Sequence, residues 1–244
     1  MSSIVDRVLL LLQKVLIYRY VRYIVGFTRY FYFVFLKRSL KTFQDKNASH
    51  LGKKTFEHNF KNIKHSILTH DRIHHLIFPL CGIVDISLNK MKYKVLSIGP
   101  RSEAELLLIA GYGFKFSNLT GIDLFSYSPQ IDVGDMHEMP YKNDSFDVIF
   151  SGWVLAYSDK QEKALKEMIR VLKPGGYIAF GQGYDKSFGK KKHELGGRNR
   201  KNSIDEIFKS IKKNIDVYFF KHDITKKMAD NGERAILAVF KIKK

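Results

Sequence analysis

Cysteine is almost absent from the sequence, because Cys81 is the only one in 244 residues. A single thiol excludes an intrachain disulfide, and it also excludes a zinc site built from cysteines. Neither of the usual stabilising devices of small secreted domains is therefore open to this chain. We expect it to work in a reducing cytoplasm.

Long uncharged hydrophobic runs are also missing. A membrane-spanning helix needs about 20 largely uncharged residues, and cations interrupt the apolar stretch from Ile4 to Leu40 throughout. No small-residue cleavage site follows the apolar run from Leu9 to Leu12, so a secretory signal is not expected. The sequence thus predicts neither a transmembrane nor a secreted protein.

Acidic residues are few relative to basic ones. There are 24 Asp and Glu against 42 Lys and Arg, which gives a net charge of +18. Such an excess favours an acidic partner: anionic lipid, nucleic acid or a phosphorylated substrate. Residues 186–201 hold seven cations and one acid among glycines. This segment is either a solvated loop or a clamp for phosphate on a substrate or membrane.

The N-terminal residues 1–41 form a basic, aromatic extension that we expect to be helical. Arg7, Lys14, Arg22 and Arg29 fall within about 80° of one another on a helical wheel, so a basic stripe runs along the apolar helix. In one interpretation, residues 4–40 lie in the interface of an anionic membrane, with cations on lipid phosphates. In the other, the helix packs on the rest of the chain or in a homodimer, and its basic stripe faces water.

Residues 42–91 are polar and are expected to be a helical cover and linker. They contain six histidines, of which His58, His65, His70, His74 and His75 suggest a metal site at first sight. No Cys, Asp or Glu completes a ligand set at zinc spacing, so we interpret them as solvated or packing residues and expect no metal site.

From residue 92 to the C-terminus, strands and helices alternate, as in a doubly wound parallel sheet. The expected strands are Lys94–Ile98, Leu119–Asp123, Val148–Ser151, Tyr177–Gly181, Asp216–His222 and Ala235–Ile242. The expected helices are Glu103–Ala110, Lys160–Leu172 and Ser203–Asn214. Pro174-Gly175-Gly176 predicts a turn after the second helix, and the last two strands predict an antiparallel hairpin.

Sheets of this kind bind nucleoside ligands at the carboxyl ends of their strands. Gly99 follows the first expected strand, and Asp123 ends the second, 24 residues later. A glycine lets a ligand approach the backbone, and an acid at this spacing accepts hydrogen bonds from ribose hydroxyls. Many nucleoside-binding folds share such a pair.

Three further motifs distinguish between the nucleoside-binding folds that share this pair. They are Gly134-Asp135-Met136-His137-Glu138-Met139-Pro140, Asn143-Asp144-Ser145-Phe146-Asp147-Val148, and Leu172-Lys173-Pro174-Gly175-Gly176. In this order, the set resembles class I S-adenosylmethionine (SAM) methyltransferases, especially the branch that includes quinone C-methyltransferases. The resemblance implies an α/β, Rossmann-like, doubly wound and mostly parallel sheet, with residues 1–41 as a helical extension. It also implies SAM as the cofactor.

The resemblance implies roles for particular residues. Gly99 would approach the methionine or ribose part of SAM, and Asp123, with Leu124 beside it, would hold the ribose. Asp135 would accept from the adenine amino group next to the Met136 backbone. Ser151, at the end of the fourth expected strand, would lie near the sulfonium.

The first glycine motif departs from the family pattern. The family has an acid at the position of Ser97 and glycines at those of Arg101 and Glu103. Glycines matter there because SAM packs against bare backbone. We hypothesise that Glu103 or Glu105 accepts from the SAM ammonium in place of the acid that is missing at Ser97.

Methyl transfer depends mainly on proximity and orientation, so the sequence predicts no catalytic residue. Three functions remain open. The first is a SAM-dependent methyltransferase for a small acceptor, anionic or lipid-linked, at a membrane surface. The second is a non-catalytic, methyltransferase-like binding or scaffold protein. The third, a nucleic-acid methyltransferase, is less favoured because the Asn/Asp-Pro-Pro-aromatic motif is absent.

Overall fold

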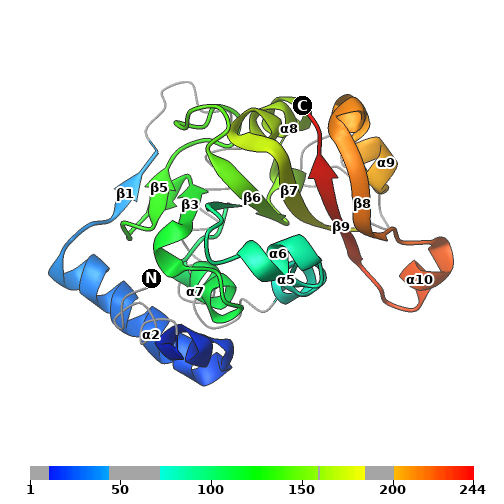
Figure 1. Cartoon of the computed structure of the whole chain (residues 1–244). Coiled ribbons are helices and arrows are strands. Elements are labelled where there is room, and N and C mark those ends of the chain that lie inside the picture. Colours follow the sequence, from blue (N-terminus) through cyan, green and yellow to red (C-terminus); the bar gives the residue numbers. More distant parts are fainter. Residues whose placement is uncertain (1–10, 44–71, 159, 185–200) are drawn as a thin grey trace.

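A seven-stranded sheet forms the centre of the molecule (Figure 1). The computed structural model describes residues 11–43, 72–158, 160–184 and 201–244. The strands are ordered β5-β3-β2-β6-β7-β9-β8. Their bounds are β2 Val95–Ile98, β3 Leu119–Asp123, β5 Ile131–Val133, β6 Phe146–Gly152, β7 Leu172–Gly183, β8 Ile215–His222 and β9 Ala235–Ile242.

The first five strands in that order run parallel, and β9 lies antiparallel to both β7 and β8. The chain adds β3 and then β5 on one side of β2, and afterwards continues with β6 on the other side. The point where the order reverses therefore lies between β2 and β6. This arrangement confirms the predicted doubly wound, mostly parallel sheet.

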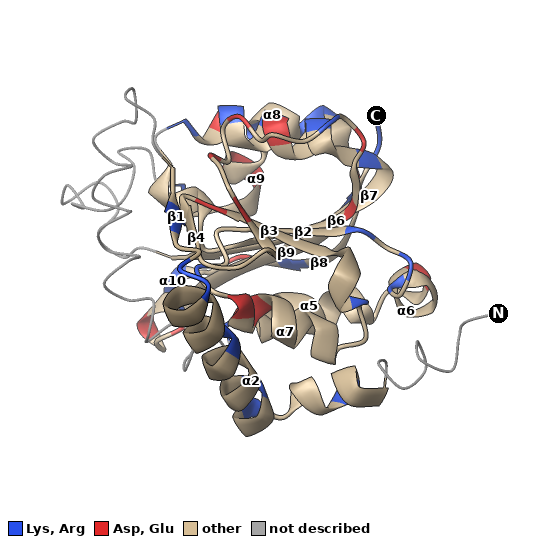
Figure 2. Cartoon of the chain, turned by 90° about the vertical axis from the view of Figure 1, so that its left-hand side faces the viewer, with Lys and Arg blue, Asp and Glu red and all other residues tan. Residues whose placement is uncertain are grey.

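Helices cover both faces of the sheet, with α8 and α9 on one face and α5 and α7 on the other (Figure 2). Their bounds are α5 His74–Cys81, α6 Val84–Asn89, α7 Glu103–Gly111, α8 Gln161–Val171, α9 Ile204–Ile207 and α10 Lys226–Asp230. Successive residues of a strand point alternately toward the two helical layers on either side of the sheet. Leu96 and Ile98 belong to the apolar core beneath α8, whereas Val95 belongs to the core beneath α5 and α7.

Two local predictions were imprecise. The helix expected over 203–214 is a short α9 followed by the 3₁₀ helix η5, Lys209–Asn214. The Pro174-Gly175-Gly176 segment is an irregularity inside β7 rather than a turn before it. Leu172 pairs with Phe146 and Tyr177 pairs with Val148, so extra residues bulge out on the β7 side.

The N-terminal extension lies along one side of the domain, against α7 (Figure 1). It consists of η1 (Val15–Ile17), α2 (Arg19–Phe31), the π-helical turn η2 (Tyr32–Leu36) and β1 (Lys41–Thr42). β1 pairs antiparallel with β4, Phe125–Ser126. The first expected domain boundary, between residues 41 and 42, falls inside β1. None of the helices in the described ranges is long and apolar enough to cross a membrane.

The extension packs on the rest of the chain, as the second interpretation expects, but two cations of its basic stripe face the domain rather than water or lipid, while Lys14 is exposed. Arg22 is 2% exposed and donates to the carbonyls of Leu16 and Ile17. Arg29 is paired with Glu103 at the start of α7. Arg7 lies outside the described residues. The outward face is apolar instead, with exposed side chains at helical spacing. These are Tyr20, Ile24, Phe27, Phe31 and Phe35.

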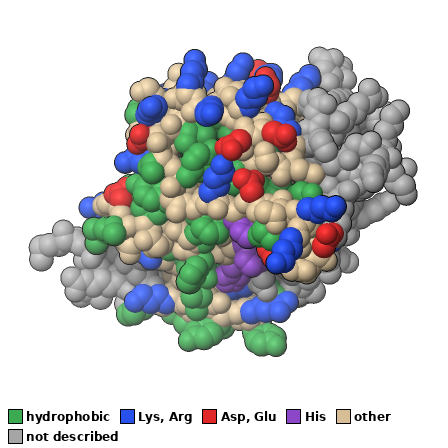
Figure 3. Space-filling view, turned by 90° about the vertical axis from the view of Figure 1, so that its right-hand side faces the viewer, with side chains coloured by type: hydrophobic (Ala, Val, Ile, Leu, Met, Phe, Trp, Pro, Cys, Tyr) green, Lys and Arg blue, Asp and Glu red, His purple; other side chains and the backbone are tan. Residues whose placement is uncertain are grey.

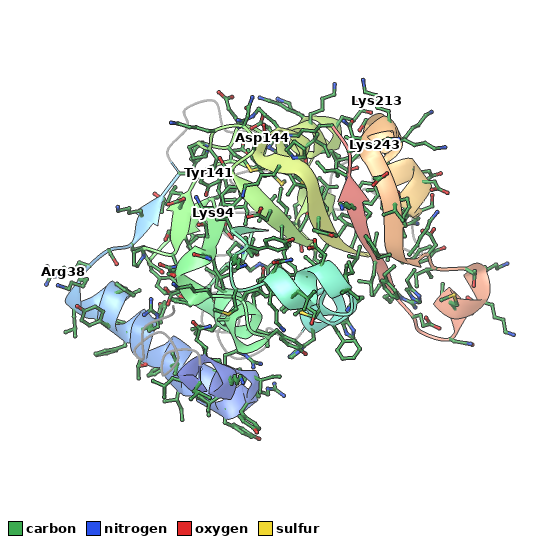
Figure 4. All side chains as sticks on the ribbon, in the orientation of Figure 1. Arg38, Lys94, Tyr141, Asp144, Lys213 and Lys243 are labelled. Atoms are coloured by element: carbon green, nitrogen blue, oxygen red, sulfur yellow. The ribbon has the colours of Figure 1, made fainter. Side chains whose placement is uncertain are left out.

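Close packing fixes the extension in place. Leu16 is buried in the core beneath α5 and α7. A Cβ at Gly111, the last residue of α7, would lie 2.7 Å from the backbone nitrogen of Ile17, so only glycine allows this approach. The Gln13 side chain hydrogen-bonds the backbone of Phe114 and Phe116. At the other end, Arg38 points away from the domain (Figure 4).

Candidate active site

The residues expected to bind a cofactor meet at the carboxyl edge of the sheet. Hydrogen bonds tie the strand ends there together: Gly99 N donates to Ile122 O (2.8 Å), and Gly134 N donates to Asp123 O (2.9 Å). Ser151 stands opposite Ile98 in the β2–β6 register. Four neighbouring strands thus bring their ends to the point where the strand order reverses, which is where such sheets bind ligands. Charged groups such as Asp144 and Lys243 mark the opposite edge (Figure 4).

The backbone at this edge is strained. Gly99 has φ +70°, while Arg101 and Trp153 have φ 54° and 59°, a conformation that side chains rarely adopt. A Cβ at Gly99 would lie 2.6 Å from the Val154 side chain. Arg101 therefore keeps a glycine-like backbone at a position where the family has glycine. Non-glycine residues held in this region often belong to functional sites.

Asp123 is buried at the end of β3 and is held by backbone donors. One oxygen accepts from Arg101 N (3.0 Å) and the other from Leu124 N (2.7 Å). Burial raises the pKa of Asp123 to about 6, although these two N–H groups act in the opposite direction. The carboxylate is thus oriented by the two loops that surround the expected ribose position.

Asp135 belongs to a hydrogen-bonded chain that the sequence did not predict. One carboxylate oxygen contacts His137 Nδ1 (2.5 Å) and also accepts from His137 N (2.9 Å). The other ring nitrogen of His137, Nε2, lies 2.6 Å from Ser158 Oγ. Burial raises the pKa of Asp135, but the hydrogen bonds from His137 outweigh it, so the pKa lies below its usual value. Asp135 is therefore fixed in orientation and ionised.

Two buried hydroxyls at this edge lack a hydrogen-bond partner within the described part of the chain. They belong to Ser151, at the end of β6, and to Ser102, which precedes α7. Buried polar groups normally have a partner. Hydroxyls without one, beside a bare Gly99 backbone and two oriented carboxylates, fit a site for a polar ligand.

Glu103 and Glu105 have different surroundings, although they lie one residue apart in the sequence. Glu103 is fully buried and accepts two hydrogen bonds from Arg29, at 2.6 and 2.8 Å, as well as one from Ser128. The acidic start of α7 lies beside α2 (Figure 2). Glu105 instead contacts the Ser97 hydroxyl. The charge of Glu103 is therefore neutralised by the N-terminal extension rather than offered to a ligand.

Aromatic side chains border the same edge near β6 and β7. The Trp153 ring lies on Gly181, and Arg72 Cζ lies 5.4 Å from the centre of that ring. Tyr157 ends the 3₁₀ helix η4, Leu155–Tyr157, and Tyr184 follows β7. Residues 185–200 lie outside the described part of the chain, and with them most of the basic segment 186–201.

A shallow groove of about 370 Å³ lies on the face of the sheet that α5 covers. It lies between α5 and the strands β8 and β9, where histidines border apolar side chains (Figure 3). Its lining includes His74, Phe78, Tyr112 and Leu237, and His74 Nδ1 lies 2.8 Å from the Tyr112 hydroxyl. The groove is on the β7 side of the sheet, remote from Asp135. His58, His65 and His70 fall outside the described residues.

Residues 96–180 match the family model described as a methyltransferase domain. The sheet order, the strand ends and this match together define a class I SAM-dependent methyltransferase domain. The resemblance recognised in the three sequence motifs is thereby confirmed for this segment.

Particular relatives are similar over short stretches. A malonyl-[acyl-carrier protein] O-methyltransferase from Methylococcus capsulatus is 30% identical over 115 residues, which are 44% of this chain and 39% of the relative. A demethylmenaquinone methyltransferase from Desulfitobacterium hafniense is 41% identical over 49 residues, which are 20% of this chain and 19% of the relative. The chain thus aligns with well under half the length of either relative.

Among solved structures, the N-methyltransferase NodS from Bradyrhizobium japonicum in complex with S-adenosyl-L-homocysteine (SAH) is similar, with a TM-score of 0.49 and 17% identity. The similarity covers 76% of this chain and 99% of NodS.

Proposed function

We propose that this chain is a SAM-dependent methyltransferase that acts on a small acceptor, either anionic or lipid-linked, at a membrane surface. The observation that carries the catalytic part is the meeting of Gly99, Asp123, Asp135 and Ser151 at one edge of the sheet. They come from four neighbouring strand ends, at the point where the strand order reverses.

Each of these residues has an assignable task. Asp123, held by two backbone N–H groups, would accept from the ribose hydroxyls. Asp135 would accept from the adenine amino group, next to the Met136 backbone. The unpartnered Ser151 hydroxyl and the bare Gly99 backbone would border the methionine part. When bound, SAM supplies a methyl group on a sulfonium, an electrophile that needs no activation by the protein.

The work left to the protein is orientation and exclusion of water. Trp153 and Arg72 stack at the β6 end of the site, where an acceptor would enter beside the methionine part. A general base is needed only for an acceptor that arrives protonated. His137 is engaged on both ring nitrogens, by Asp135 and Ser158, so we assign it to positioning Asp135 rather than to proton transfer.

The membrane part of the proposal rests on the outward face of the N-terminal extension. Phe27 is 59% exposed and Phe31 is 48% exposed, and neighbouring apolar side chains on η1 and η2 are similarly open. Large contiguous apolar surfaces are unusual on a protein that meets only water. Aromatic rings of this kind suit the boundary between lipid head groups and acyl chains.

The charge of the chain indicates that the apolar face of the extension binds a lipid surface rather than a second copy of the chain. No acidic residue occurs between Asp6 and Asp45, and the whole chain carries +18. Lys14, Lys37 and Arg38 are exposed around the apolar face. Two copies would bring like charges together, whereas anionic lipid would attract them.

The relatives' names agree with this acceptor class. One relative is named for a malonyl group on an acyl-carrier protein and another for demethylmenaquinone.

The N-terminal extension also lies close to the cofactor edge of the sheet. Its strand β1 pairs with β4, and Phe43 N donates to Leu124 O (2.7 Å) beside that edge.

The cofactor test is calorimetric titration of the full chain with SAM and SAH. We expect micromolar binding that is weakened strongly by Asp123→Ala and by Asp135→Ala, but not by Asp205→Ala on the distant helix α9. Absence of binding by folded protein would refute the methyltransferase proposal and favour a non-catalytic module.

The membrane test is flotation of the full chain with vesicles of phosphatidylcholine alone or with added phosphatidylglycerol. We expect flotation with the anionic vesicles and its loss in the double variant Phe27→Ser and Phe31→Ser. Phe78→Ser is the matched control, because Phe78 is 73% exposed but lies on α5, away from the extension. Equal flotation of all variants would contradict the proposal.

A further inference from the structure

A buried carboxylate stands beside the position where the first motif lacks its acid. Ser97 is the third residue of β2, fully buried and two residues before Gly99. Its side chain lies on the same face of the sheet as Val95, toward α7. There its hydroxyl hydrogen-bonds the carboxylate of Glu105, which belongs to the first turn of α7 and is 5% exposed. Helix α7 thus supplies a carboxylate beside Ser97, the position in β2 where the family has an acid.

Among the described residues, no cation is bonded to the Glu105 carboxylate. Within the described residues, its only side-chain hydrogen bond comes from Ser97. The charged groups around it act at longer range: Asp123 from β3, Arg101 from the loop after β2, and Arg72 ahead of α5. Burial is the largest influence and raises the pKa of Glu105 to about 7, while the Ser97 hydrogen bond and the two arginines act against it.

A buried acid without a bonded cation is costly to a protein. Glu103 avoids this cost through Arg29, whereas Glu105 does not. Of the two acids in our hypothesis, only Glu105 therefore has a charge that is still available to a ligand. Its hydrogen bond to Ser97, two residues before Gly99, places that charge near the carboxyl end of β2.

We propose that Glu105 replaces the missing strand acid and binds the α-ammonium of the methionine part of SAM. This inference rests on the proposed function. An ammonium offers three donors, and a desolvated carboxylate makes charge-assisted hydrogen bonds with it. Ser97 is the positioning residue, because its hydroxyl holds the carboxylate at the strand. The acid of this motif has thus moved from the strand to the following helix.

The test compares two ligands that differ in the ammonium. SAH carries the α-ammonium, and methylthioadenosine keeps the adenosine and sulfur but lacks the amino-acid group. Both are titrated calorimetrically into the full chain, into Glu105→Gln and into Glu162→Gln, an exposed acid in the first turn of α8 that serves as the matched control. Thermal unfolding of each variant reports its folding.

We expect Glu105→Gln to weaken SAH binding by roughly 10- to 100-fold, the usual effect of losing a hydrogen bond to a charged group, and to leave methylthioadenosine binding unchanged. Unchanged SAH affinity, or equal losses for both ligands, would overturn the inference. If wild-type protein binds neither ligand, the proposed function fails first. If it binds SAH but the variant binds it equally well, only this inference fails.

A second variant tests the location of the charge. In Ser97→Asp with Glu105→Gln, the acid returns to the strand, and we expect SAH affinity to recover toward the wild-type value. A double variant that folds but binds SAH as weakly as Glu105→Gln alone would show that the ammonium does not lie beside residue 97.

Discussion

Replacing Arg29 with alanine should destabilise the whole protein. The substitution removes both hydrogen bonds to Glu103 and leaves a carboxylate that is 0% exposed with the Ser128 hydroxyl as its remaining side-chain donor. Removing one partner of a buried ion pair typically costs about 3–5 kcal/mol. We expect Arg29→Ala to lower the free energy of unfolding by about that amount.

Related variants separate the ion pair from simple packing, because Arg29 also lies over the rings of Phe33 and Phe116. Glu103→Gln should cost less, about 1–2 kcal/mol, since the Arg29 side chain is 32% exposed and can be hydrated. The double variant should cost less than the sum of the two single ones. Lys163→Ala is the matched control: its pair with Glu138 is exposed on both sides, and we expect a loss below about 1 kcal/mol.

The assay is urea unfolding at neutral pH, followed by the fluorescence of Trp153, the only tryptophan in the chain. The double-mutant cycle then gives the coupling between Arg29 and Glu103. If Arg29→Ala costs no more than Lys163→Ala, or the cycle gives no coupling, the extension is not fastened by this ion pair and our reasoning is wrong.

Three further predictions concern other features. Gly99→Ala should lower the free energy of unfolding by at least about 1–2 kcal/mol, because Gly99 has a φ of +70° and an added Cβ would overlap with Val154. The loss should exceed that of Gly232→Ala, where the added Cβ meets no atom within 4 Å. Equal losses in urea unfolding would contradict the steric overlap. Burial raises the pKa of Glu105 from 4.5 to about 7, so folding favours its protonated form. As the pH rises from 4.5 to above 7, the free energy of unfolding of the wild type should therefore fall by up to about 3 kcal/mol relative to that of Glu105→Gln. A pH-independent difference between the two proteins in urea unfolding would refute this. The double variant Phe27→Ser and Phe31→Ser should lower the partition coefficient into anionic vesicles at least about tenfold, because less apolar area enters the lipid. The measurement is sedimentation with the vesicles. An unchanged coefficient would show that the apolar face of the extension does not contact the membrane.

Much of the sheet could be predicted from the sequence because each strand is a short apolar run with clear ends. Leu119–Asp123 and Ala235–Ile242 were predicted with the bounds that the structure has. The edge strand β5 was missed, since its three residues include an exposed Asp132 and give no alternating pattern. A three-residue strand is specified by its neighbour β3 and not by its own sequence.

The candidate site was predictable where motifs follow strands and unpredictable where distant segments meet. Asp123 and Asp135 follow strand ends, so their place at the carboxyl edge could be inferred from the sequence. The partner of Glu103 could not, because Arg29 lies 74 residues away and belongs to a segment whose charges suggested a stripe that meets lipid phosphates or water. An arginine next to apolar residues is as compatible with a buried acid as with water, and only the fold decides between them.

The position of the N-terminal extension has a consequence for the order in which the chain folds during synthesis. Ribosomes add about 5–20 residues per second, so the 74 residues from Arg29 to Glu103 take roughly 4 to 15 seconds to make. The strand β4, to which β1 pairs, follows later still. For most of this interval the extension is finished, but α7, the helix that it packs against, has not yet been made. The extension is therefore made well before its contacts exist, and its apolar residues are open to a chaperone or a bilayer before the domain can cover its inner face.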